Sequence, residues 1–363
     1  MRILFIGGGT AGHIDPALAV ARECKELMPS WIIEFLGGGA SLEKNLIPQA
    51  GFRLNVINKV PLPRKFTLST FSFPFRFLFA TFKSIIIVSK FDAVVGFGGY
   101  VAPPAYIAAK LLHKKIFIHE ANAKPGFANK LGVRFATQVW SAFPLSDRTF
   151  SKAQIVGMPL KQEIIEASKL KPEQRLAIRS EYLSSLGLSS ERSVIVVMGG
   201  SSGSHKINQI IDNVKESLIE NGFSIIHSVG SNGALHPTPH YYPAHYLYEM
   251  GKIYASADFV IARSGAVTTA EIELMGIPAL FIPLAIGNGE QSMNAQVLVK
   301  KGLAHLIPNS EFSSERLLSE ISWIKEMCDS YNGSVPSQVM REKISHQTAS
   351  EKIVGSMMKE LGK

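Results

Sequence analysis

The chain has 363 residues, of which 46% are hydrophobic, and this favours a globular protein of two domains and excludes a disordered chain. A formal net charge of +9 suits an anionic partner, which could be a nucleic acid, a phosphorylated substrate or an anionic membrane face, and the alternative is a solvated basic surface without a partner. Two cysteines, Cys24 and Cys328, are too few for a disulfide framework or a zinc knuckle and favour a reducing cytosol. The apolar run at the start of the chain predicts a strand there and no secretory signal.

The first elements predicted along the chain are a strand, a glycine turn and a helix start. Arg2–Ile6 is a short apolar run typical of a buried strand, and the glycines of residues 7–12 end it. Asp15 and Pro16 mark a helix N-terminus, so the turn can hold a phosphate on free N–H groups at the positive end of the helix dipole. His13 lies at the edge of this turn, where a neutral imidazole could take a proton from an acceptor hydroxyl. The alternative is a histidine that only caps the turn.

The remaining elements predict two similar domains. Strands alternate with helices in the first half, which indicates a parallel, doubly wound sheet. A hinge is expected near residues 157–163, and after a charged helical stretch at 161–186 the strand at 193–198 and the glycines of 199–203 repeat the opening pattern. We therefore predict an α/β chain of two Rossmann-like domains facing a central cleft, at 1–157 and 158–336, with a helical tail at 337–363 that could pack back on the first domain. Further strands are expected at 31–36, 53–57, 92–95, 115–119, 138–141, 223–229, 259–262 and 278–282, and helices at 41–50, 104–112, 268–275 and 290–300.

Ligands in such domains bind at the carboxyl ends of the strands, where small-residue turns follow four of the predicted strands, at residues 7–12, 96–100, 199–203 and 264–266. Gly7, Gly9 and Gly12 also spell G-x-G-x-x-G, the dinucleotide fingerprint. That fingerprint requires an acid at the end of the second strand, but glycines 37–39 stand there, with Glu34 inside the strand and Glu43 well past it. A nicotinamide site is therefore the second interpretation.

Three groups of polar residues each admit two readings. His119 and Asn122 close an apolar strand, as site residues or as a strand cap. Glu271, near a helix start, could bind the two hydroxyls of a ribose or complement the helix dipole, and the two roles are compatible. The histidines of 236–245 are spaced too irregularly for a zinc site and predict a plain loop.

Residues 66–90 are unusually rich in phenylalanine. Pro74, Arg76 and Lys83 interrupt the run, so we expect it to lie on an anionic membrane rather than to cross it, with aromatic side chains inserted and Arg64, Lys65, Arg76 and Lys83 at the headgroups. The alternative is a core helix with cations reaching the surface. Nucleic-acid binding is the weakest use of the charge, because basic and apolar residues interleave and no recognition motif is present.

Six motifs occur in the order typical of the MurG family, the membrane-associated N-acetylglucosaminyltransferases of peptidoglycan synthesis, and the resemblance covers almost the whole chain. They are Gly-Gly-Thr-Ala-Gly-His (8–13), Gly-Phe-Gly-Gly-Tyr (96–100), His-Glu-Ala-Asn (119–122), Gly-Gly-Ser-Ser-Gly (199–203), Arg-Ser-Gly-Ala (263–266) with Glu271, and Gln291 with Asn294-Ala295.

The resemblance implies the GT-B architecture and a specific reaction. N-acetylglucosamine would pass with inversion from UDP-N-acetylglucosamine to the 4-hydroxyl of the muramoyl unit of lipid I, giving lipid II. The enzyme would be peripheral to the cytoplasmic face of the cell (inner) membrane, and would serve cell-wall biogenesis, cell shape and cell division in the cell cycle. A UDP-N-acetylglucosamine epimerase on the same scaffold is the alternative enzyme, and a non-catalytic lipid-binding module is a third hypothesis.

By resemblance, His13 is the general base, with the donor mainly in the second domain and the acceptor against the first. The diphosphate is bound by Ser201 and the helix start after Gly265, the ribose by Glu271 and the uracil by the backbone of Leu247. No cofactor and no metal are expected, because no Asp-x-Asp motif is present and backbone donors can stabilise the leaving diphosphate. The expected substrate-binding residues are Thr10, Ala11, Gly12, Tyr100, Asn122, Lys161, Ser201, Ser202, Gly203, Asn208, Leu247, Ala266, Val267, Thr268, Thr269, Ala270, Glu271, Gln291 and Asn294.

The chain departs from the family pattern at three positions. Ala11 replaces a glycine, Lys161 stands where an arginine is usual, and Glu290 replaces a glutamine or histidine. Lysine lacks the planar fork of arginine, so the contacts of Lys161 would differ.

Overall fold

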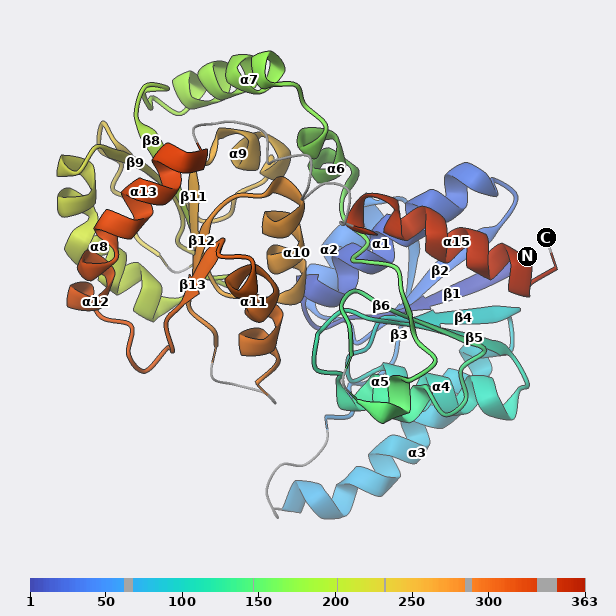
Figure 1. The fold of residues 1–363 in the computed structure, drawn as a ribbon. Coiled ribbons are helices and arrows are strands. Elements are labelled where there is room, and N and C mark those ends of the chain that lie inside the picture. Colours follow the sequence, from blue (N-terminus) through green and yellow to red (C-terminus); the bar gives the residue numbers. More distant parts are fainter. Residues whose placement is uncertain are drawn as a thin grey trace. The chain divides into compact units, whose positions relative to one another are not determined.

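The computed structural model divides the chain into two compact units, Met1–Leu160 with Ser345–Lys363, and Lys161–Ile344 (Figure 1). The division falls after Leu160 rather than at the predicted 157/158 boundary. Met158 is fully buried in the first unit, where its N–H donates to Nδ1 of His346 at 2.7 Å. The structure describes residues 1–61, 68–145, 147–200, 202–231, 233–284, 289–331 and 345–362.

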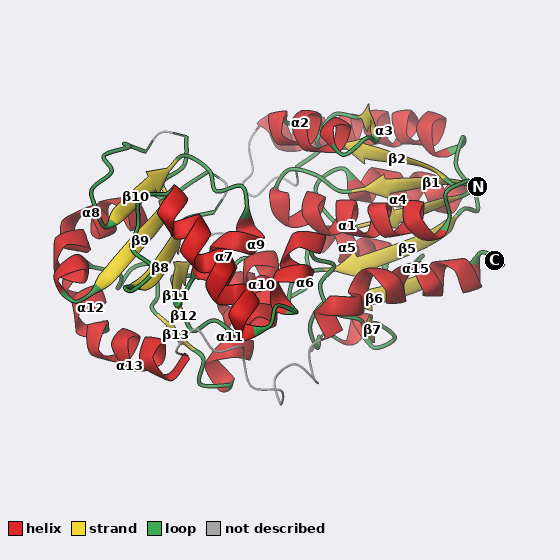
Figure 2. Cartoon of the chain, turned by 90° about the horizontal axis from the view of Figure 1, so that it is seen from above, coloured by secondary structure: helices red, strands yellow, loops and turns green. Residues whose placement is uncertain are grey.

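The first unit is a parallel sheet in the order β3-β2-β1-β4-β5-β6-β7, with helices on its faces (Figure 2). The strand order reverses between β1 and β4, which is the switch point where doubly wound sheets bind ligands. Its elements are β1 (Arg2–Ile6), α1 (Ala11–Leu27), β2 (Ile32–Gly37), α2 (Ser41–Gln49), β3 (Arg53–Val56), α3 (Leu68–Val88), β4 (Ala93–Gly96), α4 (Ala102–Leu111), β5 (Lys115–Glu120), α5 (Phe127–Gly132), β6 (Gln138–Ser141), a 3-10 turn (Arg148–Phe150), β7 (Gln154–Ile155), a second 3-10 turn (Ser345–Thr348) and α15 (Ala349–Glu360).

Both faces of strand β1 are covered, which explains its unbroken apolar sequence. Ile3 and Phe5 belong to a core cluster with α1, α2 and α15, whereas Leu4 and Ile6 belong to a second cluster with α3 and α4. All four side chains are fully buried. The C-terminal helix α15 packs on α1 and so completes the core of the first unit.

The second unit has a parallel sheet in the order β10-β9-β8-β11-β12-β13, with its switch point between β8 and β11. The predicted helical stretch at 161–186 is two helices, α6 and α7, separated by a break before Pro172. The elements are α6 (Gln162–Ser168), α7 (Pro172–Ser185), β8 (Ser193–Met198), α8 (His205–Glu220), β9 (Phe223–Ser228), β10 (Tyr241–Ala244), α9 (Met250–Ser256), β11 (Phe259–Ala262), α10 (Ala266–Met275), β12 (Ala279–Phe281), α11 (Glu290–Lys300), β13 (Ala304–Leu306), α12 (Ser314–Ser319) and α13 (Ile321–Tyr331).

Helix α3 forms most of the phenylalanine-rich stretch, and Arg64, Lys65 and Phe66 lie outside the described residues. Its window Phe71–Val88 has a mean hydropathy of 1.5 and is long and apolar enough, by length and composition alone, to cross a membrane. The interruptions therefore do not by themselves exclude a span, contrary to the sequence-based argument. One face of α3, with Ala80, Ser84 and Val88, is nevertheless buried where the helix packs along α4.

Candidate active site

The four predicted small-residue turns lie in two pairs, one at each switch point. In the first unit Ile6 and Gly96 are register partners at the ends of β1 and β4, and in the second unit Met198 and Ala262 are partners at the ends of β8 and β11. Each pair therefore brings two turns together at the carboxyl edge of its own sheet, which is where ligands of such sheets bind.

The two turns of the first unit approach each other so closely that only glycine fits between them. Gly99 has φ of 87°, and a Cβ there would lie 2.8 Å from the carbonyl oxygen of Gly8. Gly98 has φ of 95°, and its Cβ would lie 3.3 Å from Nε2 of His13. The imidazole of His13 thus lies directly against the backbone of the second turn.

His13 sits in the first turn of α1 and is fixed by the residue that precedes that helix. Nδ1 of His13 lies 3.1 Å from Oγ1 of Thr10, the N-cap of α1. Desolvation lowers the pKa of His13 below its usual range, against the opposing effect of a hydrogen bond with the backbone of Gly8. The ring is therefore neutral at neutral pH, and when Nδ1–H donates to Thr10, the Nε2 lone pair can accept a proton.

A carboxylate holds the glycine turn that leads into α1. Glu43, in the first turn of α2, is fully buried and accepts the N–H of Gly9 at 2.6 Å. Its second oxygen accepts the N–H groups of Gly39 at 2.6 Å and Ala40 at 3.2 Å. Three charge-assisted bonds therefore connect the turns that follow β1 and β2, and the turn after β1 already holds an internal anion.

A buried polar network supports the end of β5. Glu120 accepts the backbone N–H of Asn122 at 3.0 Å and that of Gly126 at 3.1 Å, and Nδ2 of Asn129 at 3.0 Å. Asn129 in turn accepts the hydroxyl of Tyr106 at 2.9 Å. Burial raises the pKa of Glu120, whereas the bonds from Asn122, Asn129 and Gly126 lower it. This network fixes the loop that carries Asn122.

His119 is not a surface residue. Its side chain is fully buried, Nε2 lies 2.9 Å from the carbonyl oxygen of Gly157, and burial lowers its pKa to about 4. The structure therefore favours the strand-cap reading for His119, whereas Asn122, in the following loop, is only half-buried.

In the second unit a guanidinium connects the two turns at the switch point. Arg263, which follows β11, donates from Nη2 to Oγ of Ser204 at 2.8 Å, and Ser204 is the N-cap of α8. Nη1 of Arg263 donates to the carbonyl oxygen of Ile282 at 2.9 Å and to Oδ1 of Asn309 at 2.7 Å. A positive side chain therefore lies beside the turn that leads from β8 into α8.

Helix α10 begins at the second turn of this pair, directly after Gly265. The first N–H groups of a helix lack partners within it, so this end can accept an anion. Glu271 lies further along α10, and its Oε2 accepts the hydroxyl of Tyr254 at 2.9 Å. Asn294 of α11 is fully buried and donates to the carbonyl oxygen of Ser264 at 3.3 Å, which helps to fix the turn between β11 and α10.

Comparisons with known proteins match both units. Residues 3–141 match the glycosyltransferase family 28 N-terminal domain and residues 194–348 the corresponding C-terminal domain. The UDP-N-acetylglucosamine--N-acetylmuramyl-(pentapeptide) pyrophosphoryl-undecaprenol N-acetylglucosamine transferase of Streptomyces coelicolor is 41% identical over 88% of this chain and 88% of its own length. The enzyme of the same name from Corynebacterium diphtheriae is 40% identical over 92% of this chain and 90% of its own.

The chain belongs to glycosyltransferase family 28, and within it to the MurG family. Acinetobacter baumannii MurG is similar in structure, with a TM-score of 0.71, 27% identity and 99% of both chains covered. A UDP-GlcNAc 2-epimerase from Neisseria meningitidis, bound to UDP-GlcNAc, has a TM-score of 0.64 at 12% identity over 99% of this chain and 100% of its own, which shows the shared fold alone.

The residues expected from the MurG pattern differ in the elements that carry them and in their exposure to solvent. Thr10, Ala11 and Gly12 form the start of α1 beside His13, and Tyr100 is exposed next to Gly99. Lys161 is the N-cap of α6, and Glu290 begins α11. Ser201 lies outside the described residues, whereas Ser202 and Gly203 follow it in the turn before α8.

Several members of the expected MurG set make internal bonds. Asn208 donates to the carbonyl oxygen of Val229 at 2.7 Å, and Gln291 accepts the N–H of Leu284 at 2.8 Å. Leu247 is buried in the loop before α9. On α10, Thr269 and Ala270 are fully buried and Ala266 and Glu271 nearly so, while Val267 and Thr268 are half-buried.

Sequence reasoning missed Glu43, Tyr254 and Arg263 as parts of the site. Glu43 had a signal, because a glutamate in the first turn of a helix commonly reaches back to N–H groups before that helix. Arg263 also had a signal, because it begins the motif Arg-Ser-Gly-Ala (263–266), although no role was given to it. Tyr254 had none, since its partner Glu271 lies on another helix.

Proposed function

We propose that the chain transfers N-acetylglucosamine from UDP-N-acetylglucosamine to the 4-hydroxyl of the muramoyl unit of lipid I, forming lipid II with inversion. The observation that carries this proposal is the 41% identity, over 88% of both chains, to a curated transferase named for this reaction. Because lipid II serves peptidoglycan synthesis, this reaction would place the enzyme in cell-wall biogenesis, and hence in cell shape and division.

The donor would use the turns of the second unit. The N-terminus of α10 offers N–H groups to the diphosphate, and Arg263 adds positive charge beside the turn before α8. These fixed donors would stabilise the charge that develops on the leaving UDP. Glu271 would accept the two ribose hydroxyls, as the motif around it implies.

His13 would act as the general base in the first unit. The acceptor hydroxyl must lose a proton as it attacks the anomeric carbon, and a neutral imidazole held by Thr10 can take it. The lowered pKa of His13 keeps the ring in the required neutral form at neutral pH.

One exposed face of α3 would bind the membrane that contains the lipid-linked acceptor, and would hold the enzyme at the cytoplasmic surface of that membrane. Six large apolar side chains lie on this face at helical spacings of three or four residues, with one adjacent pair, and each is between 50% and 75% exposed. Such a stripe, on a helix whose opposite face packs on the protein, suits insertion into the boundary region of an anionic membrane. Lys83 and Arg76 flank the stripe, Lys83 with its ammonium 4.7 Å from the ring centre of Phe79. The apolar stripe consists of Phe71, Phe75, Leu78, Phe79, Phe82 and Ile86.

The reaction is tested first by calorimetric titration, without added metal, of UDP-N-acetylglucosamine, UDP-glucose and NAD. Preference for UDP-N-acetylglucosamine supports the donor site and leads to a turnover assay with lipid I. Binding of NAD instead would contradict the transferase. Conversion of UDP-N-acetylglucosamine in the absence of lipid I, to a sugar epimer, would support the epimerase alternative.

Membrane contact is tested with vesicles that contain anionic lipid. Replacing Phe75, Phe79 and Phe82 by serine removes half of the apolar stripe and should release the protein from the vesicles. The control replaces three similarly exposed apolar residues outside α3, Leu27, Ile155 and Leu176, by serine and should bind as the wild type does. Equal binding by both variants would contradict a membrane role for the apolar stripe.

A further inference from the structure

Tyr254 lies in the last turn of α9, and its side chain contacts the carboxylate of Glu271. Its side chain is fully buried, and its hydroxyl donates to Oε2 of Glu271 at 2.9 Å. Burial and the neighbouring carboxylate raise the pKa of Tyr254 well above its ordinary value, so the phenol keeps its proton and remains a donor.

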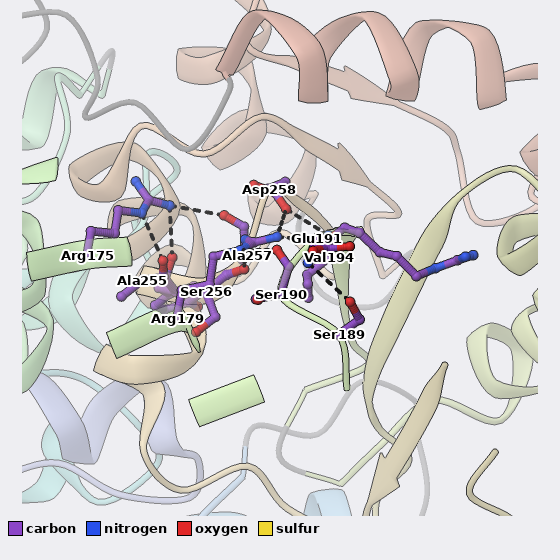
Figure 3. A network of polar contacts seen from close by, with 12 residues as sticks. Arg175, Arg179, Ser189, Ser190, Glu191, Val194, Ala255, Ser256, Ala257 and Asp258 are labelled. Carbon is purple, nitrogen blue, oxygen red and sulfur yellow. Dashed lines mark hydrogen bonds and ion pairs between the residues drawn. The ribbon is translucent and has the colours of Figure 1, made fainter. Parts of the chain in front are cut away.

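The backbone around Tyr254 is held by two arginines of α7. Arg175 donates from Nε to the carbonyl oxygen of Ala255 at 2.8 Å and from Nη2 to that of Ala257 at 3.1 Å, and Arg179 reaches the carboxylate of Asp258 at 2.8 Å (Figure 3). The ring of Tyr331 lies 4.9 Å from the Arg175 guanidinium. Arg179 also donates to the carbonyl oxygens of Ser190 and Arg192, and together the two arginines donate to those of four consecutive residues at the end of α9, Tyr254, Ala255, Ser256 and Ala257.

These carbonyl groups belong to the end of a helix, where backbone acceptors lack intrahelical partners. Two guanidinium groups satisfy them and complement the negative end of the helix dipole. The last turn of α9 is therefore fixed, and with it the position from which Tyr254 reaches Glu271.

We propose that Tyr254 is a positioning residue that orients the Glu271 carboxylate to receive the cis-diol of a ribonucleotide. The proposal rests on the ribose role given to Glu271 above. A carboxylate binds both hydroxyls of a diol at a lower entropic cost when its plane is already fixed, and the phenol holds one of its oxygens. The same geometry makes this carboxylate the feature that separates ribonucleotides from deoxyribonucleotides, because a deoxyribose leaves an acceptor unmatched.

The test uses a probe that lacks the diol. Calorimetric dissociation constants are measured for UDP and for 2′,3′-dideoxyuridine diphosphate, with the wild type and with Tyr254→Phe. We expect the substitution to weaken UDP binding by about 3- to 10-fold, the equivalent of one ordinary hydrogen bond, because the phenol acts on the nucleotide only through Glu271, and to leave binding of the dideoxy probe unchanged. A role in folding alone would weaken both ligands equally, and that result, or no effect on UDP, overturns the proposal.

Two further variants isolate the phenol. Tyr241→Phe removes another buried hydroxyl of the same unit, one that lies 3.0 Å from Nδ1 of His227, and should change neither dissociation constant. Arg175→Gln leaves the phenol in place but removes bonds that fix the end of α9. It should therefore weaken UDP binding by less than Tyr254→Phe does, and should also leave binding of the dideoxy probe unchanged. If Tyr254→Phe does not fold, an Arg175→Gln penalty that is equal on both ligands overturns the proposal instead.

The two dissociation constants of the wild type test the ribose role of Glu271 independently of the role proposed for Tyr254. If the wild type binds UDP and the dideoxy probe equally, Glu271 does not bind the ribose, and the assignment under the proposed function fails first. If the wild type prefers UDP and Tyr254→Phe keeps that preference in full, only the positioning role fails.

Discussion

The two units repeat one strand order but place opposite charges at their switch points. In the first unit the buried carboxylate of Glu43 binds the N–H of Gly9, so the glycine turn already contains an anion. In the second unit the guanidinium of Arg263 binds the cap of α8. A bound diphosphate would be repelled at the first turn and attracted at the second. The contrast teaches that a protein side chain can occupy an N–H group of a glycine turn before a helix, so that the strand, glycine and helix pattern alone does not identify a phosphate site.

The largest expected effect separates chemistry from donor binding. His13→Ala removes the base and should lower the turnover number by about 10²- to 10⁴-fold, with little change in the affinity for UDP-N-acetylglucosamine. Steady-state assays with lipid I and calorimetry measure the two quantities. His236→Ala, in an exposed loop, is the matched control. Turnover that survives His13→Ala would show that another group takes the proton.

Arg263→Gln tests the positive side of the comparison. Loss of the guanidinium should weaken UDP binding by about tenfold, the size of one charge-assisted hydrogen bond, with little change in turnover at saturating donor. Titration with UDP, and with uridine as a probe that lacks the diphosphate, measures the effect. An equal loss for uridine would mean that Arg263 supports the fold rather than the charge of the site.

Glu43→Gln tests the negative side. The amide keeps the shape of the carboxylate but places an NH₂ group among three N–H donors, so we expect a loss of about 1–3 kcal/mol in the free energy of unfolding. Turnover should fall several-fold because the start of α1 carries His13, while the dissociation constant of UDP stays unchanged. Denaturant titration and calorimetry give both numbers. A change in UDP affinity equal to that of Arg263→Gln would break the comparison between the units.

The smallest expected effect is a shift in the pH profile. Because desolvation lowers the pKa of His13, and only the neutral ring accepts a proton, kcat/KM should rise with pH and reach half its plateau below the ordinary histidine pKa of about 6.5. Thr10→Val, which removes the partner of Nδ1, should move this midpoint. An acidic limb centred above pH 6.5 would contradict a desolvated base.

Local patterns predicted the strands and turns because the physical signal lies within a few residues. Gln138–Ser141, Ser193–Met198 and Phe259–Ala262 were predicted with their observed bounds, since each lies between two other strands of its sheet and most of its residues are buried. The short strands β7, β10 and β13 were not predicted, because two to four residues near a sheet edge carry too little periodicity.

The site was predictable only where a motif is local. The glycine turn and His13 lie in one segment, whereas Glu43 meets Gly9 across 34 positions and Tyr254 meets Glu271 from a helix of seven residues that the sequence analysis did not find. For α3, composition indicated an apolar surface, but the exposed face became clear only once α4 was known to cover the other one.

Helix α15 has a consequence for how the chain is made. Ile353, Val354 and Met357 are fully buried in the cluster that also contains Ala17 and Ala21 of α1, so residues synthesised after the whole second unit complete the core of the unit that precedes it. Domains generally fold as units during synthesis. The second unit has its entire sequence before α15 exists, and it can fold while the first still exposes the apolar side of α1. In this protein the order of translation and the order of completion are reversed.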